Sequence, residues 1–175
     1  PGANAAFTRL TDQELAAVRD ADVLVSQLEI PLATVTEAAV AARAAGTRVI
    51  LHAAPARELP AELLDAVDLL VVNEGEAAAI TGKTRDEPRA LLDYVTRAVL
   101  TLGSQGACFV DRDGTELRVP AFPVETVDST AAGDAFTGAL AVAWGEGRDV
   151  VDAVRWACAA GAVCVRQVGV YASLP

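Results

Sequence analysis

Residues 22–51 read DVLVSQLEIPLATVTEAAVAARAAGTRVIL, and this stretch contains a complete strand–helix–strand unit. The apolar run at 22–27 predicts a buried strand. The alanine-rich run from Pro31 to Ala45 predicts a helix that Pro31 opens and Gly46 ends. The next apolar run, at 49–51, predicts a second strand. A strand, a crossover helix and another strand form the repeating unit of a parallel sheet.

The rest of the chain continues this alternation. Apolar runs at 69–72 and 98–102 predict two more strands, with helices expected at 62–67, 75–81 and 88–94. A capping box at Thr11 and Glu14 opens an earlier helix, and Asp113-Gly114 predicts a hairpin between strands at 107–110 and 116–119. Two long apolar helices are expected at 133–144 and 150–165. We therefore expect one α/β domain over residues 1–175, with a mostly parallel sheet covered by helices on both faces.

The composition excludes several classes of protein. A length of 175 residues with 53% hydrophobic residues suffices for one domain with a buried core. The net charge of −10 would repel phosphate backbones and anionic lipids, which argues against nucleic-acid and membrane partners. Cys108, Cys158 and Cys164 are too few and too irregularly spaced for a zinc site or a disulfide framework, which indicates a reducing, cytoplasmic setting.

The segment that points to chemistry is VDSTAAGDAF at residues 127–136. Its small side chains lead directly into a predicted helix, where unpaired backbone N–H groups and the helix dipole can bind an anion. Asp134 lies in the first turn of that helix and could take a proton from an attacking hydroxyl. From spacing alone, an equally weighted alternative is that Asp134 only stabilises the helix start.

This segment resembles the D-T-x-A/G-A-G-D signature of the ribokinase branch of the phosphofructokinase-B-type carbohydrate kinases, whose last aspartate is the catalytic base. Further stretches resemble other parts of that family in the same order. They are residues 1–6 (PGANAA), 27–29 (QLE), 54–60 (APARELP), 73–76 (NEGE) and 101–106 (TLGSQG). The matches span almost the whole chain.

The resemblance implies a ribokinase-like three-layer α/β/α sandwich and an ATP-dependent sugar kinase (EC 2.7.1.15). That enzyme phosphorylates the 5-hydroxyl of D-ribose to D-ribose 5-phosphate. Two alternatives remain open: a kinase of another sugar or a nucleoside in the same family, and a non-catalytic nucleotide-binding module. The implied cofactors are ATP, Mg²⁺ and a monovalent cation, usually K⁺. The implied assembly is a homodimer.

The resemblance also implies roles for individual residues. Asp134 would be the base and, together with Glu29, would contact the sugar; alone, Glu29 reads equally well as a solvated carboxylate at a strand end. The positions implied to bind ATP are Asn73, Thr101, Leu102, Gly103, Ser104, Gln105, Gly106, Ala132, Gly133, Asp134 and Cys158. Without the resemblance, residues 101–106 would be read as a plain glycine turn and Cys158 as a core thiol.

Metal sites are implied in two places. Glu76 would hold Mg²⁺ through water; the alternative is an exposed acid in the first turn of a helix. The monovalent cation would be bound mostly by main-chain oxygens of two loops, of which the later one also reads as a simple turn. The matching positions are Asp128, Thr130, Cys164, Gln167, Gly169 and Ser173.

Two further features look functional, a Walker-like run and the single histidine, but the residues around them argue otherwise. Residues 77–84 end in G-K-T like a Walker A loop, but alanine replaces the first glycine and no helix is expected after Lys83. His52-Ala53 stands where ribokinases typically have Asn-Pro, which leaves the fine substrate identity open. His52 has no acidic partner at a useful spacing, so we expect a structural histidine at a strand end.

Related kinases carry further parts that are not found here. These are an N-terminal portion with a sugar-binding aspartate, a G-G-K-G-A-N-type loop and a small β lid. We therefore expect additional sequence upstream of Pro1. We also expect the isolated 175-residue chain to be an inefficient kinase that tends to associate, because missing strands leave a sheet edge unpaired.

Overall fold

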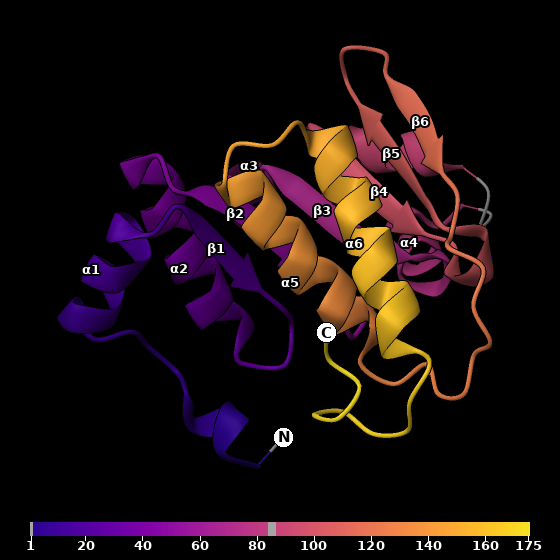
Figure 1. The fold of residues 1–175 in the computed structure, drawn as a ribbon. Coiled ribbons are helices and arrows are strands. Elements are labelled where there is room, and N and C mark those ends of the chain that lie inside the picture. The colour runs from indigo at the N-terminus through magenta and orange to yellow at the C-terminus, as the bar shows by residue number, and fades with distance from the viewer. Residues whose placement is uncertain (1, 84–86) are drawn as a thin grey trace.

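The computed structural model describes residues 2–83 and 87–175 and contains a six-stranded sheet between two layers of helices (Figure 1). The strands lie side by side in chain order. They are β1 (Val23–Ser26), β2 (Arg48–His52), β3 (Leu69–Asn73), β4 (Arg97–Thr101), β5 (Ala107–Asp111) and β6 (Glu116–Val119). Strands β1 to β4 are parallel, whereas β5 and β6 are antiparallel to their neighbours. The predicted mostly parallel sheet and the predicted hairpin are confirmed.

The helices also follow the sequence pattern. They are α1 (Asp12–Asp20), α2 (Leu32–Ala45), α3 (Ala61–Ala66), α4 (Glu74–Thr81), α5 (Ala132–Gly145) and α6 (Val150–Cys164). Three short 3₁₀ segments complete the description: η1 (Gly2–Ala6), η2 (Pro88–Asp93) and η3 (Gly103–Gln105). None of the helices in the part of the chain that the structure describes is long and apolar enough to cross a membrane.

The helix predicted at 88–94 is present, and the structure specifies its type as the 3₁₀ segment η2. Hydrogen bonds from Ala90 N–H to Glu87 O and from Tyr94 N–H to Leu91 O each span three residues, which is the 3₁₀ pattern.

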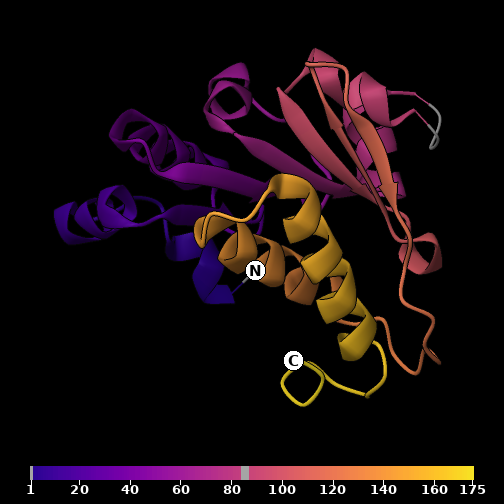
Figure 2. The same cartoon turned by 45° about the horizontal axis from the view of Figure 1, so that its top comes forward.

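The alternation of strand residues divides the core into two layers. Val49 and Leu51 of β2 pack with α2 and α3 on one face, whereas Ile50 packs with α5 and α6 on the other. Strands β3, β4 and β5 divide their buried residues in the same way, because successive side chains point to opposite faces. Figure 2 shows α5 and α6 together on one side of the sheet and α3 and α4 on the other. This is the expected three-layer α/β/α arrangement.

The parallel strands place the polar residues that follow them at one edge of the sheet. Strands β1, β2, β3 and β4 all end at this edge, and α5 begins there because it packs across β1 and β2. Ligands of open α/β sheets bind outside the carboxyl ends of the strands. Among the functional residues suggested by the sequence, Glu29, Asn73 and Thr101 lie at or just after these strand ends, and residues 132–134 begin α5.

Two sequence predictions touch residues outside this description. Pro1 of the 1–6 stretch and Thr84 of the Walker-like run are not among the described residues. The described part of that run forms α4, which ends at Thr81 with Gly82 as its cap. A phosphate loop precedes a helix, whereas this run forms one, so the rejection of a Walker A loop agrees with the fold.

Candidate active site

The start of α5 leaves backbone donors free. The N–H groups of Ala131, Gly133 and Asp134 have no hydrogen-bond acceptor among residues 2–83 and 87–175, whereas that of Ala132 donates to Ser129 O at 3.2 Å. Ala131 is the helix cap and has φ 62, a left-handed conformation that costs a non-glycine residue free energy. Unpaired N–H groups at a helix start can bind an anion.

The carboxylate of Asp134 meets two other strand ends at this point. Its Oδ1 accepts a hydrogen bond from Gln27 Nε2, which follows β1. His52 Nδ1, at the end of β2, lies 3.9 Å from the same oxygen. The Asp134 side chain is 53% exposed, so its carboxylate remains accessible to a ligand. Asp134 is therefore bonded to Gln27, has His52 beside it, and is not buried elsewhere in the fold.

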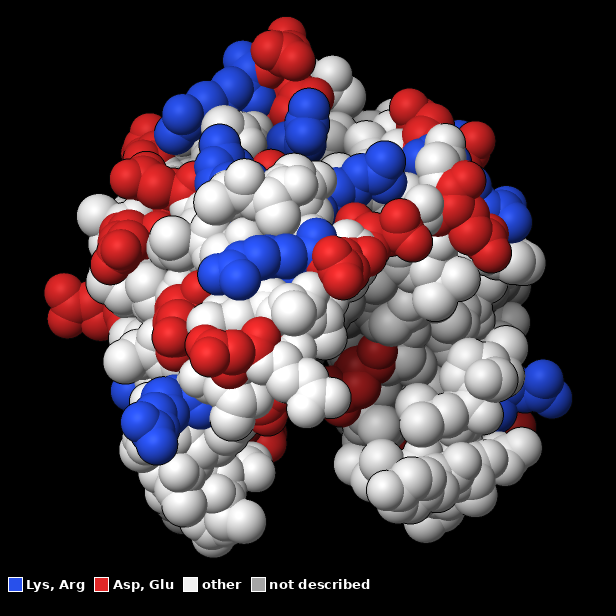
Figure 3. Space-filling model, turned by 90° about the vertical axis from the view of Figure 1, so that its left-hand side faces the viewer, with Lys and Arg blue, Asp and Glu red and all other residues white. Residues whose placement is uncertain are grey.

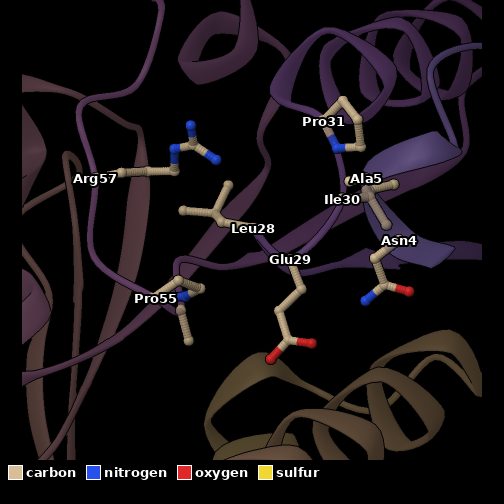
Figure 4. A pocket seen from close by; sticks show the side chains of 9 residues that line it. Asn4, Ala5, Leu28, Glu29, Ile30, Pro31, Pro55 and Arg57 are labelled. Carbon is tan, nitrogen blue, oxygen red and sulfur yellow. The ribbon is translucent and has the colours of Figure 1, made fainter. Parts of the chain in front are cut away.

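Glu29 borders an open cavity of about 760 Å³ next to this edge. The cavity is lined by residues of η1, of the β1–α2 connection and of the loop after β2, including Asn4, Glu29, Pro55 and Arg57. Figure 4 shows the Glu29 carboxylate pointing away from the Arg57 guanidinium and toward the C-terminal helices, with the Asn4 amide nearby. The cavity has the size and the polar groups that a small polyol needs.

The molecular surface is hollowed on the side that Figure 3 presents. A deep cleft opens there between two projecting segments, and acidic side chains lie recessed at its base. Lys and Arg are scattered over the outer surface of this face and do not gather around the cleft. On this face, Lys and Arg therefore do not crowd the cleft, and the unpaired N–H groups at the start of α5 are available as donors to an anion.

A second cavity, of about 390 Å³, lies between the β4–β5 turn and the two C-terminal helices. Its floor is mostly apolar and includes Phe136 of α5, while the chain at 121–124 forms a wall. The predicted nucleotide positions that line it are Thr101, Gly103, Ser104, Gly106, Ala132, Gly133 and Cys158. Segments far apart in the sequence thus form one enclosed surface beside the start of α5.

The remaining predicted nucleotide positions lie elsewhere. Asn73 pairs in register with Thr101 but caps α4, Asp134 points toward Gln27, and Leu102 packs partly into the other core layer. Gln105 is exposed and does not line the cavity. The structure therefore brings most of the predicted nucleotide positions to one cavity but not all of them.

Cys158 lies on α6 at the wall of this cavity and is 7% exposed. Burial raises the pKa of the Cys158 thiol to about 11, so the thiol stays protonated near neutral pH. The residue provides a small apolar contact surface there, which is consistent both with a position beside a nucleotide and with a core thiol.

Glu76 is buried rather than exposed, so the alternative of an exposed helix acid is wrong. Its Oε2 accepts a hydrogen bond of 2.8 Å from Asn73 N–H, and Asn73 Oδ1 accepts one of 2.9 Å from Glu76 N–H. Across the described residues, no group of three or more His, Cys, Asp and Glu side chains could hold a metal ion. The capping box occupies Oε2, and the donor set therefore fits a hydrated Mg²⁺ better than a directly bound one.

The two loops predicted to bind a monovalent cation lie against each other. Asp128 accepts hydrogen bonds from the Thr130 hydroxyl (2.7 Å), from Thr130 N–H (2.9 Å) and from Gly169 N–H (3.2 Å). In that order, these bonds hold the pKa of Asp128 below its usual range. The Cys164 thiol contacts Thr130 O at 3.6 Å and Ser173 Oγ at 3.5 Å, and Ser173 also bonds to Gly169 O.

Gln167 completes this group through its N–H, which donates to Cys164 O at 3.4 Å. All six predicted positions are thus neighbours, which turns two loops into a single unit beside the start of α5. Several of their carbonyl oxygens already accept a protein hydrogen bond. Each carbonyl retains a second lone pair, so the oxygens fit a weakly bound monovalent cation.

The sequence did not identify some residues of this site. Gln27 was noted only as part of a motif, and His52 was expected to lack an acidic partner, which the structure corrects because Asp134 lies beside it. The cavity wall at 121–124 carried no motif at all. Neighbouring strand ends offered the only usable signal, because parallel strands converge at one edge of the sheet.

Comparison with known proteins agrees with this geometry. The sequence model of the pfkB family carbohydrate kinases matches residues 1–175. The chain is 36% identical to the ribokinase of Haemophilus influenzae over 183 residues, covering 99% of the chain and 60% of that protein. It is 35% identical to a deoxyribokinase of Salmonella typhi, over 90% of the chain and 54% of that protein.

Comparison of the fold with solved structures points to the same family. The structure of Arabidopsis thaliana ribokinase complexed with ribose and ATP superposes with a TM-score of 0.91 at 32% identity, covering 96% of the chain and 57% of that protein. The chain thus spans little more than half the length of these relatives. With a family match over its whole length and a ribokinase-like α/β fold, the chain belongs to the pfkB family of carbohydrate kinases.

Proposed function

We propose that the protein transfers the γ-phosphoryl group of ATP to the 5-hydroxyl of D-ribose. The observation that carries this proposal is the start of α5, where free N–H groups of Ala131, Gly133 and Asp134 adjoin an accessible carboxylate. An open cavity bordered by Glu29 and a smaller, mostly apolar cavity beside Phe136 lie at the same edge of the sheet. This juxtaposition suits a reaction that joins an alcohol to a phosphoryl group.

In the proposed reaction, Asp134 accepts the proton of the sugar hydroxyl. The hydroxyl oxygen forms a bond to the γ-phosphorus while the bond from phosphorus to the bridging oxygen breaks, and that oxygen leaves with ADP. The free N–H groups at the start of α5 stabilise the negative charge on the transferring group, since they are already oriented and need no rearrangement. Glu29 binds sugar hydroxyls and orients the acceptor.

The second cavity suits the nucleotide. Phe136 and Cys158 provide an apolar surface for a base, and the glycines at 103 and 106 let the chain approach closely without side chains. When bound, Mg²⁺ neutralises phosphate charge, and Glu76 is the residue that would hold it through water. Asp128 and its partners would hold a K⁺ that steadies the loop before α5.

The sugar is the least determined part of this proposal. The relatives include both ribokinases and a deoxyribokinase, which differ by one hydroxyl of the substrate. A site that hydrogen-bonds a hydroxyl discriminates strongly against the analogue that lacks it. Comparing kcat/KM for ribose, 2-deoxyribose and a nucleoside panel, with the complete protein encoded by the gene, decides between these substrates.

Asp134→Asn tests the mechanism. We expect kcat for phosphoryl transfer to fall by about 10²–10⁴-fold, since the amide cannot take the proton. The dissociation constant for ATP should stay within about twofold, because the free N–H groups are unchanged. Production of ribose 5-phosphate is followed by coupled ADP release, and ATP binding by calorimetry.

Asp152→Asn is the matched control. Asp152 is the third residue of α6, as Asp134 is of α5, and it is exposed and paired only with Arg155 among the described residues. Its replacement should leave kcat unchanged. An Asp134→Asn enzyme with normal turnover removes the base role, and a wild-type protein that binds ATP but phosphorylates no sugar supports a non-catalytic nucleotide-binding module.

A further inference from the structure

We propose that His52 and Gln27 are positioning residues for Asp134: together they hold its Oδ1 and leave Oδ2 as the oxygen that meets the acceptor hydroxyl. This inference rests on the proposed function and adds the residues that orient the base. Both side chains come from strand ends that meet the start of α5 only in the folded protein.

The first observation is that both side chains approach the same carboxylate oxygen of Asp134. Gln27 Nε2 donates to Asp134 Oδ1, and His52 Nδ1 lies 3.9 Å from it. Asp134 Oδ2 has no hydrogen-bond partner among the described residues. A carboxylate anchored through one oxygen keeps its plane fixed, so its other oxygen points in one direction.

The second observation is the burial of an unpaired nitrogen. His52 Nδ1 is the one buried side-chain nitrogen or oxygen, among residues 2–83 and 87–175, without a hydrogen-bond partner. A polar atom that has lost its water and gained no partner raises the free energy of that state. Asp134 is the acid nearest to this nitrogen, and an approach of about 1 Å would form a normal N–H···O bond.

The third observation fixes the ring against the helix. A Cβ built on Gly133 would lie 3.0 Å from His52 Cε1 and 3.4 Å from His52 Nε2. The imidazole therefore packs directly beneath the first turn of α5, with its Cε1–Nε2 edge toward Gly133 and its Nδ1 toward Asp134. The side chain is only 12% exposed, so it cannot swing away without leaving a gap under the helix tip.

These contacts give the two residues a role in the chemical step rather than in binding. Neither side chain lines the apolar nucleotide cavity or the cavity at Glu29. Both act through Asp134, whose orientation matters most when the proton moves. Misplacing a reacting group by about 1 Å can cost on the order of 10²-fold in rate.

The kinetic test compares asparagine and glutamine at position 52, whose side-chain amides lie at different distances from the backbone. The Nδ2 of asparagine can occupy the place of His52 Nδ1, whereas the longer glutamine places its amide near Nε2. We expect His52→Ala and His52→Gln to lower kcat about 10- to 100-fold, with KM for ribose and ATP within about threefold. His52→Asn should recover most of kcat, because it restores a donor at the Nδ1 position.

Gln27→Ala is tested beside Gln13→Ala, an exposed glutamine of α1. Only the change at Gln27 should lower kcat, again with little effect on KM. A His52→Gln enzyme as active as His52→Asn would overturn the assignment of Nδ1. If the variants at His52 and Gln27 raised KM by as large a factor as they lowered kcat, the two residues would shape the substrate pocket and would not position the base.

A spectroscopic test needs no turnover. The 175-residue chain contains one histidine, so ¹⁵N-histidine labelling gives signals from His52 alone. Asp134→Asn should shift the imidazole nitrogen signals, whereas Asp152→Asn should leave them in place. An unchanged spectrum in Asp134→Asn overturns the pairing even if the protein is a kinase, and a shifted spectrum supports it even if ribose is not the substrate.

Discussion

A Cβ on Gly133 would lie only 3.0 Å from Cε1 of the His52 imidazole, a contact so close that the ring would have to move slightly. Gly133 also donates a free N–H at the anion site and lines the apolar cavity proposed for the nucleotide. A methyl group here would push against the His52 ring. The sequence pattern A-A-G-D thus reflects a packing requirement as well as an electrostatic one.

Gly133→Ala should therefore weaken both stability and function. We expect the free energy of unfolding to fall by about 1 kcal/mol, because the ring must shift by a few tenths of an ångström. Gly138→Ala in the same helix is the control, since a Cβ there meets nothing within 4 Å. It should add about 0.5–1 kcal/mol by reducing the freedom of the unfolded chain.

Urea unfolding and ATP titration measure both variants. The interpretation fails if Gly133→Ala is as stable as Gly138→Ala and binds ATP as the wild type does.

The turn between β4 and β5 shows how one element is placed by its neighbour. Gly106 ends η3 with φ 94, and a Cβ on it would lie 2.0 Å from Val119 O of β6. The backbone of the hairpin strand therefore passes directly over this glycine. That close approach fixes how the loop at 103–106 faces the nucleotide cavity.

Gly106→Ala should be among the most destabilising single changes in the chain. Gly114 of the hairpin also has a positive φ, 100, but a Cβ there meets nothing within 4 Å. Gly114→Ala is expected to cost about 1 kcal/mol from backbone strain alone. Gly106→Ala should exceed it by at least about 2 kcal/mol, because a backbone clash is added to the same strain.

Denaturant unfolding of the two variants compares these costs directly. Equal losses would mean that the hairpin can move away from Gly106 at no cost.

At the scale of the whole molecule, Asp128 joins the loop before α5 to the chain after α6. Its hydrogen bonds from Thr130 and Gly169 favour the charged carboxylate, so its pKa in the folded state lies below the unfolded value. A depressed pKa contributes stability above the ordinary carboxyl range, near about 4. That contribution is lost as the pH falls through the folded pKa.

Asp128→Asn should therefore lower the melting temperature near pH 7, while the difference from wild type shrinks as the pH approaches about 3. Asp65→Asn, an exposed acid of α3, is the control and should show no such convergence. Melting curves across this pH range test the linkage. A constant difference at every pH would mean that the Asp128 charge plays no part in joining the two segments.

Much of the architecture follows from local sequence. The strand–helix–strand unit at 22–51, the hairpin at Asp113-Gly114 and the capping box at Thr11 depend on side chains within a few positions of one another. The periods of 2 and 3.6 residues are therefore visible without any tertiary information. The resemblance to the pfkB kinases, which the family match confirms, supplied the order of the candidate site residues.

Contacts between distant segments needed the folded chain. The Asp134–Gln27 hydrogen bond, the His52 ring under Gly133 and the bond between Asp128 and Gly169 each join residues from different elements. No local pattern encodes them, because they arise only when parallel strands bring their ends to one edge and α5 crosses that edge. Local sequence thus specified the helices and strands and indicated the chemistry, whereas tertiary packing set which side chains meet the carboxylate.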